Sequence, residues 1–514
     1  MKTFKNMPDF EEIIEAEEVI SPAEAKFERW RNRAGFFLAP FVFLLIYFSP
    51  LNLKPEAHSL AAIIAAVIVL WICESLPMPV TALIGAALCV LLKVAPAKEV
   101  FAPYADPLIF LFIGSFILAR AIFLHELDKR FAYGVLSLKW IGARPSRILF
   151  AFGAVTAFIS AWISNTATTA MMFAIGLSII NFLLAQERET GVKINRNYAT
   201  ALMLITSFAA SIGGLATPIG TPPNVIGLGF IRQLTGTEIS FFKWMLIGVP
   251  VVIVLYIFLY FYINYLAPAG VKEIAGSAEM IQREKAKLGS WTRAQKSTVI
   301  AFAVAVSLWI FSGLVALVVG DQSELYKAIN TRLPEAVGAI IGAVLLFLLP
   351  GNEKGERAIT WNEAVKIDWG VILLYGGGFA LGVLSFQTGL AEAMGRSLTT
   401  VLPVSGGFGL LAASVIVAVL ISETTSNTAS ANMVVPVVIA IAKAQGADPL
   451  IPALGATFGA SLGFMLPVST PCNAIVYGSG YIPLMKMVRY GILLDIFGAV
   501  VIILMLTLLE PFLR

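Results

Sequence analysis

The 514-residue sequence predicts an all-α polytopic membrane protein. Its residues are 58% hydrophobic and only 13% charged, whereas about 25% of the residues in an ordinary soluble domain are charged. Apolar segments recur along the chain on the scale of a membrane span, which takes roughly 20 residues. The tripeptide Ser-Asn-Thr occurs in such surroundings twice, at residues 164–166 and 426–428. These observations predict about eleven transmembrane helices and two re-entrant hairpins in an inverted repeat.

A polar arm, residues 1–34, precedes the first half of the chain. The arm ends in cations and a tryptophan, so the positive-inside rule predicts a cytoplasmic N-terminus. In the first half, residues 35–266, we expect spans at 35–50, 59–76, 78–93 and 107–124, a hairpin at about 148–185, a broken helix at 198–233 and a span at 244–266. Basic loops flank the hairpin on both sides, which places its two ends on the cytoplasmic face and Ser164-Asn165-Thr166 at its tip.

The broken helix is predicted from Thr217-Pro-Ile-Gly-Thr-Pro-Pro-Asn224. Two adjacent prolines remove backbone donors and prevent a continuous helix. Irregular backbone at membrane depth survives only where protein buries it or where it lines a cavity. The segment is therefore expected to unwind beside a cavity.

A basic hydrophilic loop at 267–296 is predicted as a cytoplasmic linker. The second half, residues 297–514, then repeats the plan with spans at 297–319, 336–350 and 368–390, a hairpin at about 406–443, a broken helix at 451–483 and a span at 487–512. The second tip is Ser426-Asn427-Thr428, and the second break carries Leu466-Pro-Val-Ser-Thr-Pro-Cys-Asn473. Loop 351–367 is basic but 391–406 has one arginine, so this hairpin should open outside and the C-terminus should lie outside. Such halves are typical of an inverted-repeat secondary transporter.

Other classes of protein fit the composition poorly. The net charge of +4 is small and dispersed, which argues against a nucleic-acid partner. Cys73, Cys89 and Cys472 lie in apolar segments without metal-ligand spacing, so they are expected to be core residues. His58 and His125, the two histidines, lie next to predicted segment ends. A membrane-embedded enzyme needs a nucleophile with a base, or a metal cluster, and no histidine lies within a span.

The two tips offer uncharged oxygen atoms that suit a monovalent cation. Ser160 and Ser422 each precede a tip serine by four residues, so each hairpin presents two hydroxyls on one helix face. The broken helices add Gly220 and Ser469, small residues that let backbone oxygens approach closely. Small polar residues can also merely join helices. Two matched copies, each paired with a proline-broken span, favour the cation site.

The same region offers donors for a carboxylate. Neither tip and neither proline-containing break contains Lys or Arg. Hydroxyl and amide donors at the tips and opposite them, together with helix N-termini, must therefore hold an anion; these donors are Asn165, Thr166, Asn427, Thr428, Thr221 and Thr470. A dianion at membrane depth requires counter-charge, which bound cations would supply. Glu423, beside the second tip, is either a proton or cation site or an acid that faces an aqueous vestibule.

On these motifs the sequence after about residue 35 resembles the divalent anion/sodium symporter (DASS) family, which transports succinate, malate, fumarate, citrate and related anions. The resemblance implies a homodimer in the bacterial inner membrane, with a scaffold domain and a transport domain that moves like an elevator. It implies at least two Na⁺ sites, the first formed by Ser160, Ser164, Asn165 and Gly220 and the second by Ser422, Thr425, Asn427 and Ser469. It implies substrate contacts from Asn165, Thr166, Thr221, Asn427, Thr428, Thr470 and Pro471.

The sequence departs from the family pattern at Cys472, where the second proline of the motif is replaced, and at Ser422, which stands in place of threonine. Both changes keep size or hydroxyl character. The leading interpretation is sodium-coupled uptake of a di- or tricarboxylate. The alternatives are a sodium-independent dicarboxylate exchanger, a sulfate transporter of the same family and a passive anion channel.

Overall fold

The structure is built of helices. The computed structural model describes residues 22–191, 195–320, 322–401 and 406–513, and no β-strand forms within them. Ten of the described helices are long and apolar enough to cross a membrane, or eleven if the pair α15 (Glu324–Arg332) and α16 (Glu335–Leu348), bent by 44°, counts as one span. This confirms the predicted all-helical membrane protein. Residues 1–21, the larger part of the predicted arm, lie outside the described residues.

Helices of the first half begin and end where local chemistry predicts. Several start with a proline in the first turn, where its missing N–H and fixed φ do no harm. Two end at Gly191 and Gly236, whose φ values of 71° and 76° favour glycine. The elements are α2 (Pro22–Tyr47), α3 (Pro55–Cys73), α4 (Met78–Leu91), α5 (Ala97–Phe101), η1 (Ala102–Ala105), α6 (Pro107–Leu124), α7 (Leu127–Leu136), α8 (Pro145–Ser160), α9 (Asn165–Thr190), α10 (Asn197–Gly213), η2 (Gly214–Ala216), α11 (Pro222–Thr235) and α12 (Phe241–Leu266).

The second half follows the same order of a hairpin, a broken helix and a final long helix. Its elements are α13 (Ser277–Lys287), α14 (Arg293–Val319), α15, α16, α17 (Trp361–Ala364), α18 (Trp369–Gln387), α19 (Leu390–Val401), α20 (Gly407–Thr424), α21 (Asn427–Ala444), α22 (Leu450–Gly459), η3 (Pro467–Ser469), α23 (Pro471–Tyr477) and α24 (Leu484–Leu513). The ten candidate spans include α9, α20 and α21, which the sequence assigns to hairpins, because length and apolar composition alone define them.

Three predicted loops contain short helices, and the prediction of plain loops is wrong there. α13 lies in the predicted linker, α7 in the basic loop before the first hairpin, and α19 in the loop before the second hairpin. Each packs on neighbours: α13 on α7 and α9, α7 on α8, and α19 on α21. Short charged helices give no span signal, and tertiary packing of one apolar face stabilises them. Helix α2 also begins inside the predicted polar arm and continues into the first span.

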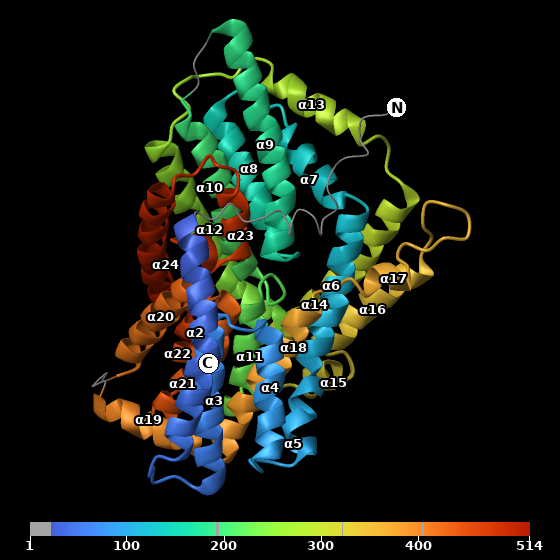
Figure 1. Cartoon of the computed structure of the whole chain (residues 1–514). Helices are drawn as coiled ribbons and strands as arrows, with labels where there is room; N and C mark the ends of the chain where they lie inside the picture. Colours follow the sequence, from blue (N-terminus) through green and yellow to red (C-terminus); the bar gives the residue numbers. More distant parts are fainter. Residues whose placement is uncertain (1–21, 192–194, 321, 402–405, 514) are drawn as a thin grey trace.

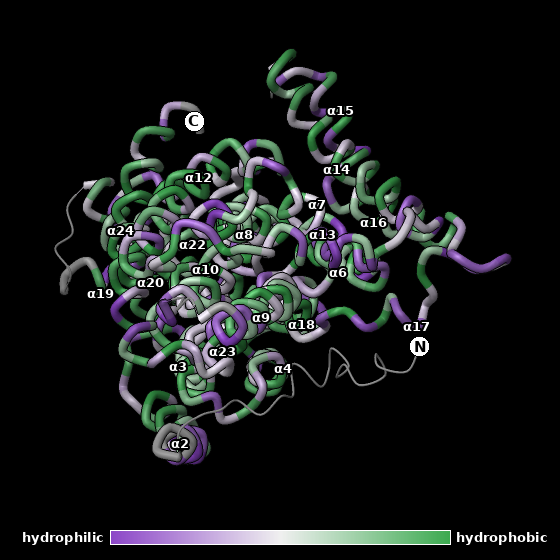
Figure 2. Tube along the Cα trace, turned by 90° about the horizontal axis from the view of Figure 1, so that it is seen from above, coloured by the Kyte–Doolittle hydropathy of each residue, from purple (hydrophilic) through white to green (hydrophobic). Residues whose placement is uncertain are grey.

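The hairpins and broken helices form one packed group. α10 is its centre, since every residue from Thr200 to Gly213 is buried. α8, α9 and α23 pack against α10, and α20 and α21 pack against α22. Helices α6, α14 and α16 pack together as a second group, which Figures 1 and 2 show at one edge of the molecule. In Figure 1 the α8–α9 hairpin occupies the upper part of the first group and the α20–α21 hairpin the lower part.

Candidate functional site

Each Ser-Asn-Thr tripeptide begins the second arm of its hairpin. Ser164 caps α9, because its Oγ accepts a hydrogen bond from the Ala167 N–H at 3.3 Å. Ser426 caps α21 in the same way, accepting from the Ala429 N–H at 3.2 Å. Serine is a preferred N-cap because its oxygen satisfies a backbone donor of the first turn. The asparagine and threonine that follow therefore occupy the positive end of a helix.

In each broken helix the side chain of one asparagine hydrogen-bonds to the unwound backbone. The sequence analysis gave these two asparagines no role. Asn224 Nδ2 donates to the carbonyl oxygens of Gly214 at 2.9 Å and Thr217 at 2.8 Å. Asn473 Nδ2 donates to those of Gly463 at 3.0 Å and Leu466 at 2.9 Å. Both asparagines are fully buried. Their shared position, three residues after the motif threonine, is the signal that could have identified them.

Replacing Asn473 by alanine is expected to destabilise the protein by about 2–4 kcal/mol, because two buried carbonyl groups lose their donor. The measurement is the apparent unfolding temperature of the purified protein in detergent. Asn181→Ala is the matched control, since Asn181 is exposed on α9. If both variants unfolded at the wild-type temperature, the amide would not support the break.

Both tips and both proline motifs converge on one cavity, with about 540 Å³ of space open to water. The N-termini of α9 and α21 and the caps of α11 and α23 all face it. Positive helix ends and backbone N–H groups suit a carboxylate. All the residues predicted to contact substrate line this cavity: Asn165, Thr166, Thr221, Asn427, Thr428, Thr470 and Pro471.

The predicted cation residues divide into two sets. One set lines the same cavity: Ser164, Asn165, Gly220, Asn427 and Ser469. The other set, Ser160, Ser422 and Thr425, is not on the cavity wall and has at most 1% of its surface exposed. The structure therefore brings the predicted residues of each repeat together, with the hydroxyls of the first hairpin arms buried behind the tips.

Oxygen atoms crowd around Asn165 in the first repeat. One end of its side-chain amide lies 2.7 Å from Ser160 Oγ, 3.1 Å from the Ala210 carbonyl oxygen and 3.2 Å from the Gly220 carbonyl oxygen. The amide nitrogen can occupy this end as a donor. If the amide oxygen occupies it instead, a cation can satisfy all four oxygens. These four oxygens therefore fit sodium, which binds uncharged oxygens of this kind.

The second repeat shows the same crowding. Ser422 Oγ lies 2.7 Å from Asn427 Oδ1 and 2.8 Å from the Ala460 carbonyl oxygen. A hydroxyl has one hydrogen, so it cannot donate fully to both acceptors. Thr425 Oγ1 donates to the Ile421 carbonyl oxygen at 2.8 Å and keeps its lone pairs free. This set of oxygens also fits a cation.

Charged residues at the cavity wall are a feature that the sequence analysis missed. Arg120, Lys366 and Asp368 line the cavity from the second group of helices and its neighbours. Glu363 Oε2 accepts from Arg120 at 2.6 Å, and its Oε1 accepts from Lys366 at 3.0 Å. These hydrogen bonds, from Arg120 first and Lys366 second, hold the pKa of Glu363 below its usual range. A lone arginine inside the predicted span at 107–124 was the available signal.

The charges of this cluster largely cancel. Arg120 and Lys366 both pair with Glu363, and the second carboxylate, Asp368, caps α18 by accepting from the Val371 N–H at 3.1 Å. Among the described residues that line the cavity, Arg120 and Lys366 are the cationic ones. The uncharged donors of the tips are therefore the main groups available for binding a carboxylate.

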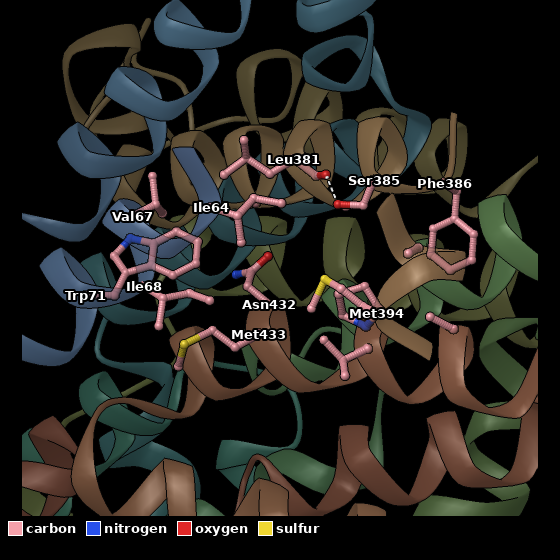
Figure 3. Close-up of a pocket in the computed structure, with 16 residues that line it drawn as sticks. Ile64, Val67, Ile68, Trp71, Leu381, Ser385, Phe386, Met394, Asn432 and Met433 are labelled. Atoms are coloured by element: carbon pink, nitrogen blue, oxygen red, sulfur yellow. Dashed lines mark hydrogen bonds between the residues drawn. The ribbon is translucent and has the colours of Figure 1, made fainter. Parts of the chain in front are cut away.

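A second cavity, between α3, α18, α19 and α21, is unsuited to an anion (Figure 3). Aromatic, aliphatic and methionine side chains form its walls, including Trp71, Met394 and Met433. Its polar side chains are Ser385 and Asn432, and Ser385 Oγ donates to the Leu381 carbonyl oxygen at 2.8 Å. Because mostly apolar side chains line this cavity and none of its lining residues is a cation, it suits a carboxylate poorly.

Most of the chain is similar to known membrane proteins. Residues 31–513 match the family described as the sodium:sulfate symporter transmembrane region. The chain is 36% identical over 485 residues to the sodium-dependent dicarboxylate transporter SdcS of Staphylococcus saprophyticus, which covers 93% of this chain and 91% of that protein. Its identity to SdcS of Staphylococcus aureus is 35% over the same length.

Two solved structures share the fold. The YdaH transporter of Alcanivorax borkumensis has a TM-score of 0.54 at 14% identity and covers 95% of this chain and 98% of that chain. MtrF of Neisseria gonorrhoeae has a TM-score of 0.51 at 14% identity, with coverage of 82% and 85%. At this identity the likeness concerns the arrangement of helices and carries nothing about substrate.

Proposed function

The chain belongs to the sodium:sulfate symporter family, and from this membership we propose that it couples sodium entry to the uptake of a dicarboxylate. The family and the similar proteins are transporters, which confirms that the chain is an integral membrane transporter and not an enzyme. The name of SdcS, a sodium-dependent dicarboxylate transporter, supports both the ion and the substrate class.

One observation carries the proposal: the two tips and the two proline motifs, more than 200 residues apart in sequence, meet in one cavity. Asn165 and Thr166 approach it from one hairpin and Asn427 and Thr428 from the other. Two sets of donors, one from each hairpin, suit a molecule with a carboxylate at each end. Succinate, malate and fumarate have this shape, and citrate adds a third carboxylate.

The chain's own residues do two things in this mechanism. The amides and hydroxyls at the tips orient the carboxylates, and the helix N-termini favour their negative charge. Ser160, Ser164, Asn165 and Gly220 in one repeat would form one sodium site. Ser422, Thr425, Asn427 and Ser469 in the other repeat would form a second. Bound sodium supplies the positive charge that offsets a dianion at membrane depth.

We further propose that the hairpin group moves against the second group of helices as a transport domain against a scaffold. The cavity lies between the two groups, because α6 contributes Phe116, Arg120 and Phe123 to its wall and α18 contributes Val371. Sliding one wall past the other would expose the site to each side in turn. The placement of the hairpins at opposite ends in Figure 1 supports the inverted repeat. The cytoplasmic N-terminus, external C-terminus, bacterial inner membrane and homodimer remain part of this proposal.

The test is uptake of labelled succinate by proteoliposomes that contain the purified protein. We expect accumulation above the equilibrium level under an inward sodium gradient and no accumulation when choline replaces sodium. Unlabelled malate, fumarate, citrate and sulfate, added in turn, would identify the preferred anion by competition. Uptake driven by preloaded dicarboxylate without sodium would contradict symport and establish the exchanger. Uptake that never exceeds the electrochemical gradient would indicate a channel.

A further inference from the structure

Two buried carboxyl groups lie side by side behind the second tip. Glu423 directly follows Ser422 near the end of α20, and Asp495 lies within α24. Glu423 is 2% exposed and Asp495 is 4% exposed. The two carboxyl groups are close enough to interact electrostatically. The sequence analysis singled out Glu423 alone, because nothing local connects it to a residue 72 positions later.

The packing of α24 independently places Asp495 here. Gly491, one turn earlier, packs so closely that a Cβ would contact the Phe464 carbonyl oxygen and lie 2.6 Å from Met465 Cα. The Met465 N–H in turn donates to Glu423 Oε1 at 2.8 Å. Residues four apart share one face of a helix. Asp495 therefore faces the segment that holds Glu423.

Among the described residues, hydrogen-bond donors reach the carboxylate of Glu423 but not that of Asp495. Besides the Met465 N–H, Ser469 Oγ donates to Glu423 Oε2 at 2.7 Å. Both oxygens of Asp495 are buried, and no hydrogen bond reaches either of them from the described residues. In the described part of the chain, no Lys, Arg or His forms an ion pair with either carboxylate. Two uncompensated buried carboxylates are costly, so a bound cation or a proton must offset their charge.

The first repeat lacks this feature. Gly248 on α12 packs against the Leu215 carbonyl oxygen as Gly491 packs against that of Phe464. Leu215 follows Gly214, whose carbonyl oxygen accepts a hydrogen bond from Asn224. Phe464 likewise follows Gly463, whose carbonyl oxygen accepts one from Asn473. By this correspondence Val252 of the first repeat matches Asp495 of the second, and Ala161 matches Glu423. Because the first break forms without carboxylates, the pair is not needed to build a broken helix.

We propose that Glu423 and Asp495 bind one further sodium ion, beside the cation site of the second tip. This inference rests on the proposed sodium-coupled function. Carboxylate oxygens are hard ligands that suit hard cations, and sodium is the cation to which the proposed function couples. Ser469 hydrogen-bonds to Glu423 and is also predicted to serve the tip site. Occupation of the two sites should therefore be coupled.

The experiment counts radioactive sodium bound per chain in the purified, full-length protein at saturating succinate. Asp495→Asn keeps the shape of the side chain and removes its charge, and we expect it to bind one sodium ion fewer than wild type. In proteoliposomes, the number of sodium ions moved per succinate, measured from the reversal potential, should also fall by one. Asp495→Glu, which retains the carboxylate, should keep the wild-type count.

Glu392→Gln is the control, because it removes an exposed carboxylate from α19. It should leave both sodium counts unchanged. An unchanged count in Asp495→Asn would overturn the proposal, since the pair would then share a proton. If Asp495→Asn did not fold, bound sodium would be counted in Glu423→Gln instead. A wild-type sodium count in that variant would overturn the proposal. Failure of the wild type to bind sodium would instead contradict the proposed function.

Discussion

Replacing Asn165 or Asn427 by alanine is expected to lower sodium-driven uptake by about 100-fold or more. Each side chain is both a predicted cation ligand and a predicted substrate donor, and each packs against the buried serine of its own hairpin. Losing one charge-assisted contact costs about 1.5–3 kcal/mol, and about 1.4 kcal/mol corresponds to a tenfold change. Uptake of labelled succinate into proteoliposomes measures the loss. The two variants should be affected alike because both repeats share the cavity.

The control for these variants is again the exposed Asn181 of α9, since Asn181→Ala removes the same chemical group from the same helix as Asn165. It should transport at the wild-type rate. Size-exclusion profiles of all three variants should match wild type. Near-normal uptake by Asn165→Ala or Asn427→Ala would place the transport site elsewhere.

Gly220→Ala is expected to cause a loss of similar size through backbone crowding. A Cβ at this position would lie 2.5 Å from the Gly214 carbonyl oxygen and 2.9 Å from Gly214 Cα. Backbone atoms cannot move aside like the end of a flexible side chain, so the broken segment must shift. That shift would displace the Gly220 carbonyl oxygen from its place 3.2 Å from the Asn165 amide. Sodium dependence of uptake is the measurement, and we expect the half-saturating concentration to rise at least tenfold where any uptake remains.

Gly134→Ala provides the matched control, because a Cβ at this position on α7 would meet nothing within 4 Å. Alanine also has a higher helix propensity than glycine. This variant should therefore transport normally and be no less stable than wild type. Wild-type sodium affinity in Gly220→Ala would mean that the first broken helix does not contribute to cation binding.

The same position in the second repeat shows what a local motif leaves undecided. Ser469 corresponds to Gly220, yet its side chain is accommodated, because it turns toward Glu423 and donates to it at 2.7 Å. Proline spacing predicts both breaks equally well. Which break tolerates a side chain depends on the neighbouring helix, where one repeat has Asp495 and the other Val252.

The short helices α7, α13 and α19 were missed for a related reason. Hydropathy identifies long apolar segments, since a lipid environment requires every backbone group to be satisfied within the segment. A short charged helix has no such requirement, and its stability comes from the face that it buries. Ala132 and Tyr133 of α7 are buried in this way, and Ile281 of α13 is buried as well.

By itself the sequence determined the membrane class, the two hairpins, the two proline-broken helices and the family, because composition, tripeptide repeats and proline geometry act locally. Only the tertiary structure decided which distant residues meet. It joined Arg120 to Glu363 and set Asp495 against Glu423. The physical reason is that burial and charge compensation depend on neighbours from other helices. These neighbours are brought together by packing, which no local pattern in the chain encodes.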